Sequence, residues 1–396
     1  MTKQTYKHGY DMIYLAACAI HQEVPAAERI ASMSLPDVYR IAKHHGMQAI
    51  TFSGLELRLA SSSDTAEKIP KELLKKWAED KAKSIRKNIL LEAERSKLFD
   101  FLDAHAIWYM PLKGVILQDF YPEYGMRQMV DNDILFDSNY RDRVREYFLE
   151  NGYSEAERED ESHDVYSKLP VYNFEMHFSL HRRTVDSLFY EYYKNVKERL
   201  LPVDAAHPME CRFSDEDFYI YCLSHSYKHF LYAGIGIRSL LDIYVYLDAR
   251  KEELDWGYIA KECETLRMTS YEKNAKALAE TFFRKPGVTE EDLTEEEQEL
   301  AEFFLSSGSH GTAENRIVQK IRASSREEHS LSVADRFRYL LQRLFPDMDY
   351  IQKYYPLCGR YKILLPFLVF WRGIKLLLLR PKDLFTELKL VWKTKK

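Results

Sequence analysis

The chain has 396 residues, of which 46% are hydrophobic and 30% are charged, and its formal net charge at pH 7 is −5. This length is enough for two or three domains with sizeable cores, and the apolar content excludes an intrinsically disordered chain. Because the charge balance is acidic, no overall basic field draws the protein to nucleic acid, and the sequence carries no strong nucleic-acid signal.

The five cysteines are widely scattered and include no Cys-x-x-Cys pair. This spacing predicts neither a disulfide framework nor a zinc knuckle, and it favours a cytoplasmic location. The N-terminal residues lack the apolar run of a secretory signal, so none is expected. No stretch of 18 or more apolar residues is present, so a membrane-spanning helix is not expected either.

Residues 1–104 are predicted to form an N-terminal helical region. Leu35-Pro36-Asp37 is typical of a helix start, and apolar residues follow it at helical spacing. Residues 70–104 have a charged amphipathic pattern, which predicts one long helix or two joined helices.

Residues 105–200 are predicted to form a small mixed β-sheet with short helices between its strands. The pair Lys113-Gly114 ends the first, aromatic strand, and Gly152 ends a charged amphipathic helix. The expected order is strand, helix, strand, helix, strand, strand, at 107–112, 115–120, 130–136, 139–151, 163–169 and 171–180.

Residues 201–305 are predicted to form a C-terminal helical domain, and residues 306–396 a helical tail that is basic and apolar. From residue 360 onwards the tail has ten Lys and Arg residues and two acidic ones. We favour packing of this tail on the acidic helical domain or on a second subunit. The alternative is peripheral contact of residues 361–396 with an anionic membrane surface. The predicted fold class is therefore α+β, with a small mixed sheet flanked by N- and C-terminal helical regions.

Asp131 and Asp133 are the most informative residues of the chain. They stand at i and i+2 in a run of strand-forming residues, so their side chains share one face of the sheet. Two like charges this close are costly unless a cation lies between them. A divalent metal ion that carries the phosphates of a nucleotide meets that need, which indicates phosphoryl or nucleotidyl transfer.

A second acidic strand strengthens this interpretation, because Glu175 and His177 share the polar face of residues 171–178. With Asp131 and Asp133, Glu175 would complete a set of three oxygen ligands, which suits Mg²⁺ better than zinc. The alternative is an exposed sheet face with scattered acidic residues.

Several motifs together resemble the uncharacterised nucleotidyltransferase family of the polymerase-β-like superfamily. The resemblance covers roughly residues 10–265. The motifs are Leu112-Lys113-Gly114, Tyr121-Pro122, Arg127, Asp131-x-Asp133 and Glu175-x-His177 in the core, with His45-Gly46 before it and His225-x-x-Lys228-His229 after it.

The resemblance implies a minimal nucleotidyltransferase core at residues 105–200. Asp131, Asp133 and Glu175 would be the catalytic carboxylates and the ligands of Mg²⁺ (or Mn²⁺), and Glu175 or the substrate itself would act as general base. The remaining motif residues would bind the nucleotide, an NTP such as ATP. They are Lys113, Gly114, Arg127, His177, Lys228 and His229.

Some of these residues have a second interpretation. Better-known nucleotidyltransferases have Gly-Ser or Gly-Gly where this chain has Lys113-Gly114. The alternative for Lys113 is a surface lysine that caps a turn. Arg127 can pair with a neighbouring acid. The helix face of His225, Lys228 and His229 suits a nucleotide contact, a polar seam between helical domain and sheet, or a zinc site. Arg238 and Asp242 have the spacing of a helix ion pair.

These features predict a metal-dependent nucleotidyltransferase that transfers an NMP from an NTP to an acceptor. The alternatives are a catalytically degenerate protein that binds a nucleotide or a partner on the same fold, and a helical scaffold in which the sheet is incidental. The sequence does not specify the acceptor, which is a small molecule, a sugar, RNA or a protein.

Overall fold

A computed structural model describes six long stretches of the chain and several short ones. They are residues 3–61, 69–156, 162–183, 186–203, 206–232, 234–308, 311, 336, 340, 351, 355–368, 371–372 and 391. The chain divides into two compact units, one made of residues 1–227 and 236–309 and the other of residues 228–235 and 310–396. The sheet and most of the helices belong to the first unit.

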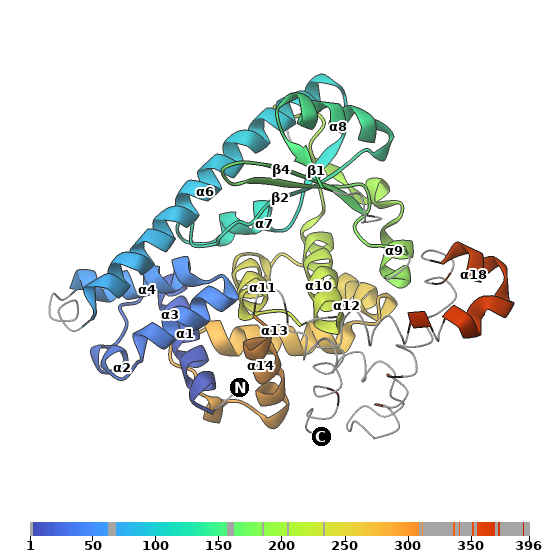
Figure 1. Ribbon diagram of the computed structural model, residues 1–396. Coiled ribbons are helices and arrows are strands. Elements are labelled where there is room, and N and C mark those ends of the chain that lie inside the picture. The colour runs from blue at the N-terminus through green and yellow to red at the C-terminus, as the bar shows by residue number, and fades with distance from the viewer. Residues whose placement is uncertain are drawn as a thin grey trace. The chain divides into compact units, whose positions relative to one another are not determined.

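The N-terminal region is helical, as predicted. Its helices are α1 (Lys3–His21), α2 (Ala27–Ala31), α3 (Leu35–His45), α4 (Gln48–Ser61) and α6 (Lys71–Ala104). α3 begins at the expected Leu35-Pro36 and ends at Gly46, whose φ of 63° is a left-handed conformation that glycine adopts without strain. α1 packs on α3 and α4, and the single long helix α6 runs from this group to the sheet (Figure 1).

A small mixed sheet follows α6, and its strands have the predicted order with one short addition. The strands are β1 (Tyr109–Pro111), β2 (Asn132–Phe136), β3 (Ser154–Glu155), β4 (His163–Lys168) and β5 (Tyr172–His177). Their spatial order is β1-β2-β5-β4-β3, in which β2 and β5 are parallel and all other neighbours are antiparallel. The predicted α+β class with a small mixed sheet is therefore confirmed. The short helices α7 (Gly114–Leu117) and α8 (Arg141–Glu150) also lie where the sequence indicates them.

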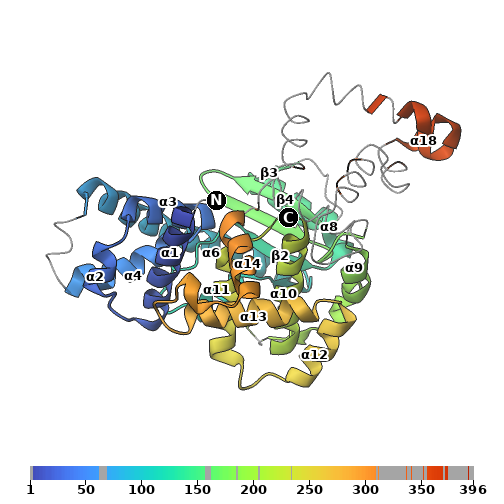
Figure 2. The same cartoon turned by 90° about the horizontal axis from the view of Figure 1, so that it is seen from below.

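The two faces of the sheet differ because side chains alternate along each strand. On one face, Ile134, Phe136, Phe174 and Met176 join the buried core formed with α6 and α8. The other face carries Asp133, Glu175 and His177. It is turned towards α7, α10 (Asp215–Tyr232) and α11 (Ile237–Arg250), which lie below the strands in Figure 1, and Figure 2 shows α10 and α11 from that side.

The C-terminal part of the first unit is mainly helical. Its elements are α9 (Ser187–Tyr193), the two-stranded sheet of β6 (Leu201–Pro202) and β7 (Cys211–Arg212), α10, α11, α12 (Trp256–Thr265), α13 (Thr269–Phe283) and α14 (Glu295–Ser307). α14 begins with a capping box, in which Thr294 and Glu297 satisfy each other's backbone N–H groups. The second unit includes the end of α10, α18 (Pro356–Arg360) and a turn of 3₁₀ helix at Lys362–Leu364.

His45 joins the N-terminal helices to the C-terminal ones. Its Nδ1 accepts a hydrogen bond from the backbone N–H of Ile237 at 3.3 Å, and its Nε2 lies 3.2 Å from the carbonyl oxygen of Leu305. Burial lowers the pKa of His45 to about 3, so the ring is neutral and can donate to one partner while it accepts from the other. The His45-Gly46 motif therefore has a structural role in this protein.

Most of the predicted basic tail lies outside the described residues, including 373–390 and 392–396. Among the helices that the structure describes, none has the length and apolar character needed to cross a membrane.

Candidate active site

The polar face of the sheet carries five titratable side chains from three adjacent strands, which we call the acidic cluster: Asp131, Asp133, Glu175, His177 and His163. Asp133 of β2 stands opposite Glu175 of β5 in the parallel register, and His163 of β4 stands opposite His177. Asp131 directly precedes β2. The chain thus brings together residues that are more than 40 positions apart, because β5 pairs with β2 on one side and with β4 on the other.

His177 links the two central carboxylates of the cluster. Its Nε2 lies 3.0 Å from Oδ1 of Asp133 and 3.6 Å from Oε2 of Glu175. Burial disfavours a charged imidazole, but the hydrogen bonds to Asp133 and Glu175 outweigh this and raise the pKa of His177. His177 therefore contacts Asp133 and Glu175 directly.

Lys113 places a positive charge beside the cluster. Its Nζ lies 3.1 Å from Oδ2 of Asp133, and the side chain is largely buried. Burial disfavours the ammonium, but Asp133, Asp131 and Glu175 outweigh burial and raise the pKa of Lys113. Lys113 is thus not a surface lysine that caps a turn. Its backbone φ of 38° is rare for a residue with a side chain, so the turn that points it at Asp133 is strained.

The two aspartates of the motif have opposite electrostatic environments. Burial would raise the pKa of Asp133, but the ammonium of Lys113 and the hydrogen bond from His177 hold it well below the usual range. Burial, followed by the charges of Asp133 and Glu175, raises the pKa of Asp131 to about 6. One lysine therefore neutralises Asp133 and leaves Asp131 under repulsion.

Arg127 forms the predicted alternative, an ion pair, with a partner that sequence spacing did not indicate. Its Nε and Nη2 donate to the two carboxylate oxygens of Asp242 at 2.8 and 2.9 Å. Tyr121, the tyrosine of the Tyr-Pro motif, donates to the same carboxylate at 2.7 Å. Gly114 makes room for this pair, since a Cβ at that position would lie 2.5 Å from Nη1 of Arg127.

The expected ion pair between Arg238 and Asp242 is wrong, because Asp242 is bound by Arg127 and Tyr121. Arg238 donates instead to the carbonyl oxygen of Gln128 at 3.4 Å. Among the described residues it has no carboxylate partner within 4.0 Å. Burial and the charge of Arg127 lower the pKa of Arg238, while the carboxylates of Asp242 and Asp131 act in the opposite direction. Arg238 thus lies beside the acidic cluster without a direct carboxylate contact among the described residues.

Lys228 and His229 lie in the last turns of α10 and belong to the second compact unit, whereas His225 belongs to the first. The ring of His225 lies 6.4 Å from that of Tyr221. Contact of Lys228 and His229 with a nucleotide stays a prediction.

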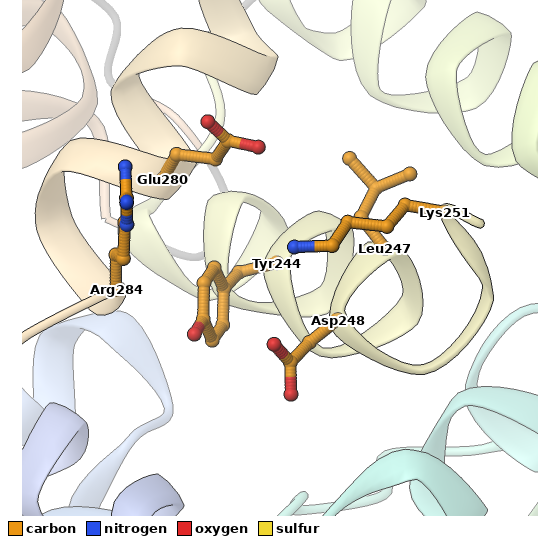
Figure 3. A pocket seen from close by; sticks show the side chains of 6 residues that line it. All are labelled: Tyr244, Leu247, Asp248, Lys251, Glu280 and Arg284. Atoms are coloured by element: carbon orange, nitrogen blue, oxygen red, sulfur yellow. The ribbon is translucent and has the colours of Figure 1, made fainter.

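A separate pocket of about 260 Å³ lies between the C-terminal half of α11 and α13 (Figure 3). It shares no residue with the acidic cluster. Its lining carries charges of both signs and consists of Tyr244, Leu247, Asp248, Lys251, Glu280 and Arg284.

The donor atoms of the acidic cluster fit a divalent metal ion. Asp131, Asp133 and Glu175 offer carboxylate oxygens on one face, and a cation among them would relieve the repulsion that raises the pKa of Asp131. Sequence reasoning missed His163. The sequence does contain a signal for this residue. β4 and β5 form a hairpin that turns at Pro170, and because His163 and His177 are equally far from Pro170, they stand opposite each other.

Comparison with known proteins agrees with the motifs on this face. The sequence model of a family described as an uncharacterised nucleotidyltransferase matches residues 32–284, which include the acidic cluster, Arg127 and Arg238. No curated protein and no solved structure matches the chain significantly.

Proposed function

The chain belongs to the uncharacterised nucleotidyltransferase family, and on this premise we propose that it transfers an NMP from an NTP to an acceptor with the help of Mg²⁺ or Mn²⁺. One observation carries the proposal: the parallel pairing of β2 with β5 sets Glu175 beside Asp133, and Asp131 precedes them on the same face. A protein that only binds a partner has no need for three carboxylates that repel one another.

Asp131, Asp133 and Glu175 would hold the metal, which when bound polarises phosphate oxygens and offsets the charge of the leaving pyrophosphate. Lys113 keeps Asp133 ionised and places an ammonium where a phosphate oxygen can meet it. His177 fixes the carboxylate of Asp133 through the hydrogen bond at 3.0 Å. These contacts hold the donor atoms in place before a nucleotide arrives, which is what electrostatic catalysis requires.

The sequence offered Arg127 for phosphate binding or for an ion pair, and we propose that these two roles belong to Arg238 and Arg127. Arg127 is engaged by Asp242, so we assign it to positioning α11 rather than to direct phosphate binding. Arg238, on the same helix as Asp242, is the guanidinium that can accept a phosphate group. Gly114 serves this arrangement by leaving space for Arg127. Lys228 and His229 are retained as proposed nucleotide contacts at the end of α10.

The function is tested by incubating the protein with each of the four labelled NTPs, Mg²⁺ or Mn²⁺, and cell extract, and by following label and pyrophosphate. Label should move to an acceptor with the wild type and not with Asp133→Asn. Asp142→Asn, which removes an exposed carboxylate from α8, is the matched control and should behave as the wild type. If the NTPs raise the melting temperature but no label moves, the protein is the degenerate nucleotide-binding alternative and the proposal fails.

We further propose that the C-terminal tail contacts an anionic membrane surface. Its described part exposes large apolar side chains, including Leu357 (69%), Ile363 (82%), Phe367 (71%) and Trp371 (58%). Exposed apolar side chains mark a surface that meets a partner or a membrane, and the basic residues among them suit an anionic membrane surface. Packing on the acidic helical domain or a second subunit stays the competing prediction. Co-sedimentation with phosphatidylserine vesicles should fall at least several-fold in a Phe367→Ser/Trp371→Ser variant, and equal sedimentation of both proteins would contradict membrane contact.

A further inference from the structure

We propose that His163, Glu175 and His177 form a binding site for a transition-metal ion, for which Zn²⁺ is the best match. One ligand atom from each residue lies within 4.8 Å of the other two. The site shares Glu175 with the proposed catalytic carboxylates, but His163 lies outside every motif of the nucleotidyltransferase resemblance. The inference goes beyond nucleotidyl transfer, because metal binding at this site requires no nucleotide.

The distances suit a single ion bound by nitrogen and oxygen. Oε2 of Glu175 lies 3.7 Å from Nε2 of His163 and 3.6 Å from Nε2 of His177. Two ligands bound to Zn²⁺ at about 2.0–2.1 Å in tetrahedral geometry lie roughly 3.4 Å from each other. Oδ1 of Asp133, 3.0 Å from the same nitrogen of His177, is in reach as a fourth ligand. The three ligand atoms lie within 4.8 Å of one another, so closing them to a tetrahedral set takes a shift of up to about 1.4 Å between the two imidazole nitrogens.

The orientation of His163 is set by its neighbour. The hydroxyl of Ser162 lies 3.1 Å from Nδ1 of His163 and so occupies that ring nitrogen, while Nε2 faces Glu175. Ser162 is itself fixed, because its carbonyl oxygen accepts hydrogen bonds from the backbone N–H groups of Phe178 and Ser179. A partner on the second ring nitrogen is the usual support of a metal-bound histidine.

Charge and access also favour a cation. The carboxylates of Asp133 and Glu175 lie within 4 Å of His177, and Glu175 lies 3.7 Å from His163. Of the nearby positive groups, the ammonium of Lys113 is engaged with Asp133, and Arg238 acts on Asp131. The side chains of His163 and Glu175 are 18% and 28% exposed, so an ion can reach them from solvent, whereas His177 is buried and held. Nδ1 of His177 is buried without a hydrogen-bond partner among the described residues, so this ring lacks the support that Ser162 gives to His163 and is held through its Nε2 contacts.

The ligand types separate this site from a magnesium site. Imidazole nitrogen is a common ligand of Zn²⁺, Cu²⁺ and Ni²⁺, whereas Mg²⁺ and Mn²⁺ favour oxygen ligands, and Mg²⁺ keeps much of its water. Asp131 and Asp133 offer oxygen alone, and the Glu175 side of the cluster offers two nitrogens. The two sides of the cluster are thus suited to different metals.

Calorimetric titration of Zn²⁺ into the full-length, chelator-treated protein without nucleotide tests the proposal. His163→Gln should weaken Zn²⁺ binding at least 10-fold, a loss that removal of a supporting or direct ligand commonly causes. His207→Gln, which changes a partly exposed histidine paired with Asp103, is the matched control and should leave the affinity as in the wild type. X-ray absorption of the zinc-loaded wild type should show two imidazole ligands, and His163→Gln should show one.

Equal Zn²⁺ affinity in the wild type and His163→Gln would overturn the proposal, as would a zinc spectrum without imidazole. Thermal melting in chelator separates loss of the site from loss of the fold, and Ser162→Ala gives a second, milder variant that should also weaken binding. Since these readouts involve no NTP, absence of nucleotidyl transfer leaves them unaffected, and absence of a zinc site leaves the transfer assay unaffected.

Discussion

Two groups of buried charges lie close together in this protein, and they are balanced differently. Arg127 and Asp242 form a one-to-one, two-point ion pair that Tyr121 completes. The acidic cluster sets three carboxylates against the ammonium of Lys113. Buried charges in folded proteins are normally paired. We therefore assign the balanced pair to the fold, and the excess of negative charge supports the proposed cation site.

The largest expected effect is on activity. Glu175→Gln should lower the rate of nucleotidyl transfer by about three orders of magnitude, since it removes one of the proposed metal ligands. The melting temperature should change little, because the substitution also removes a like charge from the cluster. Transfer rates and thermal melting of the same preparation test both parts. If Glu175→Gln lost as much unfolding free energy as Asp242→Asn is expected to lose, the acidic cluster and the Arg127–Asp242 pair would not differ in their effect on stability.

The opposite pattern is expected for the balanced pair. Asp242→Asn leaves Arg127 buried without its partner and should cost about 3–5 kcal/mol of unfolding free energy. Urea unfolding measures this loss. Asp248→Asn, an exposed position on the same helix, should cost less than about 0.5 kcal/mol. A loss in Asp242→Asn no greater than in this control would show that the pair does not stabilise the fold.

A smaller effect is expected at Arg238, which has no direct carboxylate contact among the described residues. Arg238→Gln should raise the KM for the NTP about 10- to 100-fold, because one charge-assisted contact to phosphate is lost. Its unfolding free energy should stay near that of the wild type, since the guanidinium gives up only one long hydrogen bond. Steady-state kinetics with varied NTP provide the measurement. An unchanged KM would assign the phosphate contact elsewhere.

The smallest effect is the pH dependence of Asp131→Asn. Asp131 has a pKa of about 6 in the folded chain, above the ordinary value of 3.8, so the folded state binds more protons than the unfolded state between these values. Wild-type stability should therefore fall as pH rises from about 4 to 6, and the variant should lack this loss. Above pH 6 and in chelator, Asp131→Asn should be more stable by about 1–2 kcal/mol. Equal stability of the two proteins at pH 7 would contradict repulsion at Asp131.

The sequence indicated the cluster because its signals are local. Asp131 and Asp133 alternate within one strand, and Glu175 and His177 alternate within another, so each pair could be assigned to a face without knowledge of the fold. Their assembly into one set of ligands was inferred from the two acidic strands and then implied by the family resemblance, and the parallel pairing of β2 and β5 agrees with it.

The residues that the sequence left unassigned depend on contacts between distant segments. Asp242 meets Arg127 across 115 positions, and no spacing rule links them. The rule that does apply, the i,i+4 pairing of Arg238 with Asp242, is worth only a few tenths of a kcal/mol and gives way to a buried two-point ion pair. His163 could be assigned to the cluster only from the register of the β4–β5 hairpin, because a strand predicted at 163–169 does not by itself show which residue of β5 His163 faces.

The strained turn at Lys113 has a consequence for how this position can vary. A glycine there would adopt the positive φ without cost and relax the turn, but it would remove the ammonium that offsets three carboxylates. Lys113→Gly should thus ease the backbone and worsen the electrostatics at the same time. Lys113 therefore strains the backbone of the turn, but its ammonium offsets the repulsion among the carboxylates while no metal or nucleotide is present.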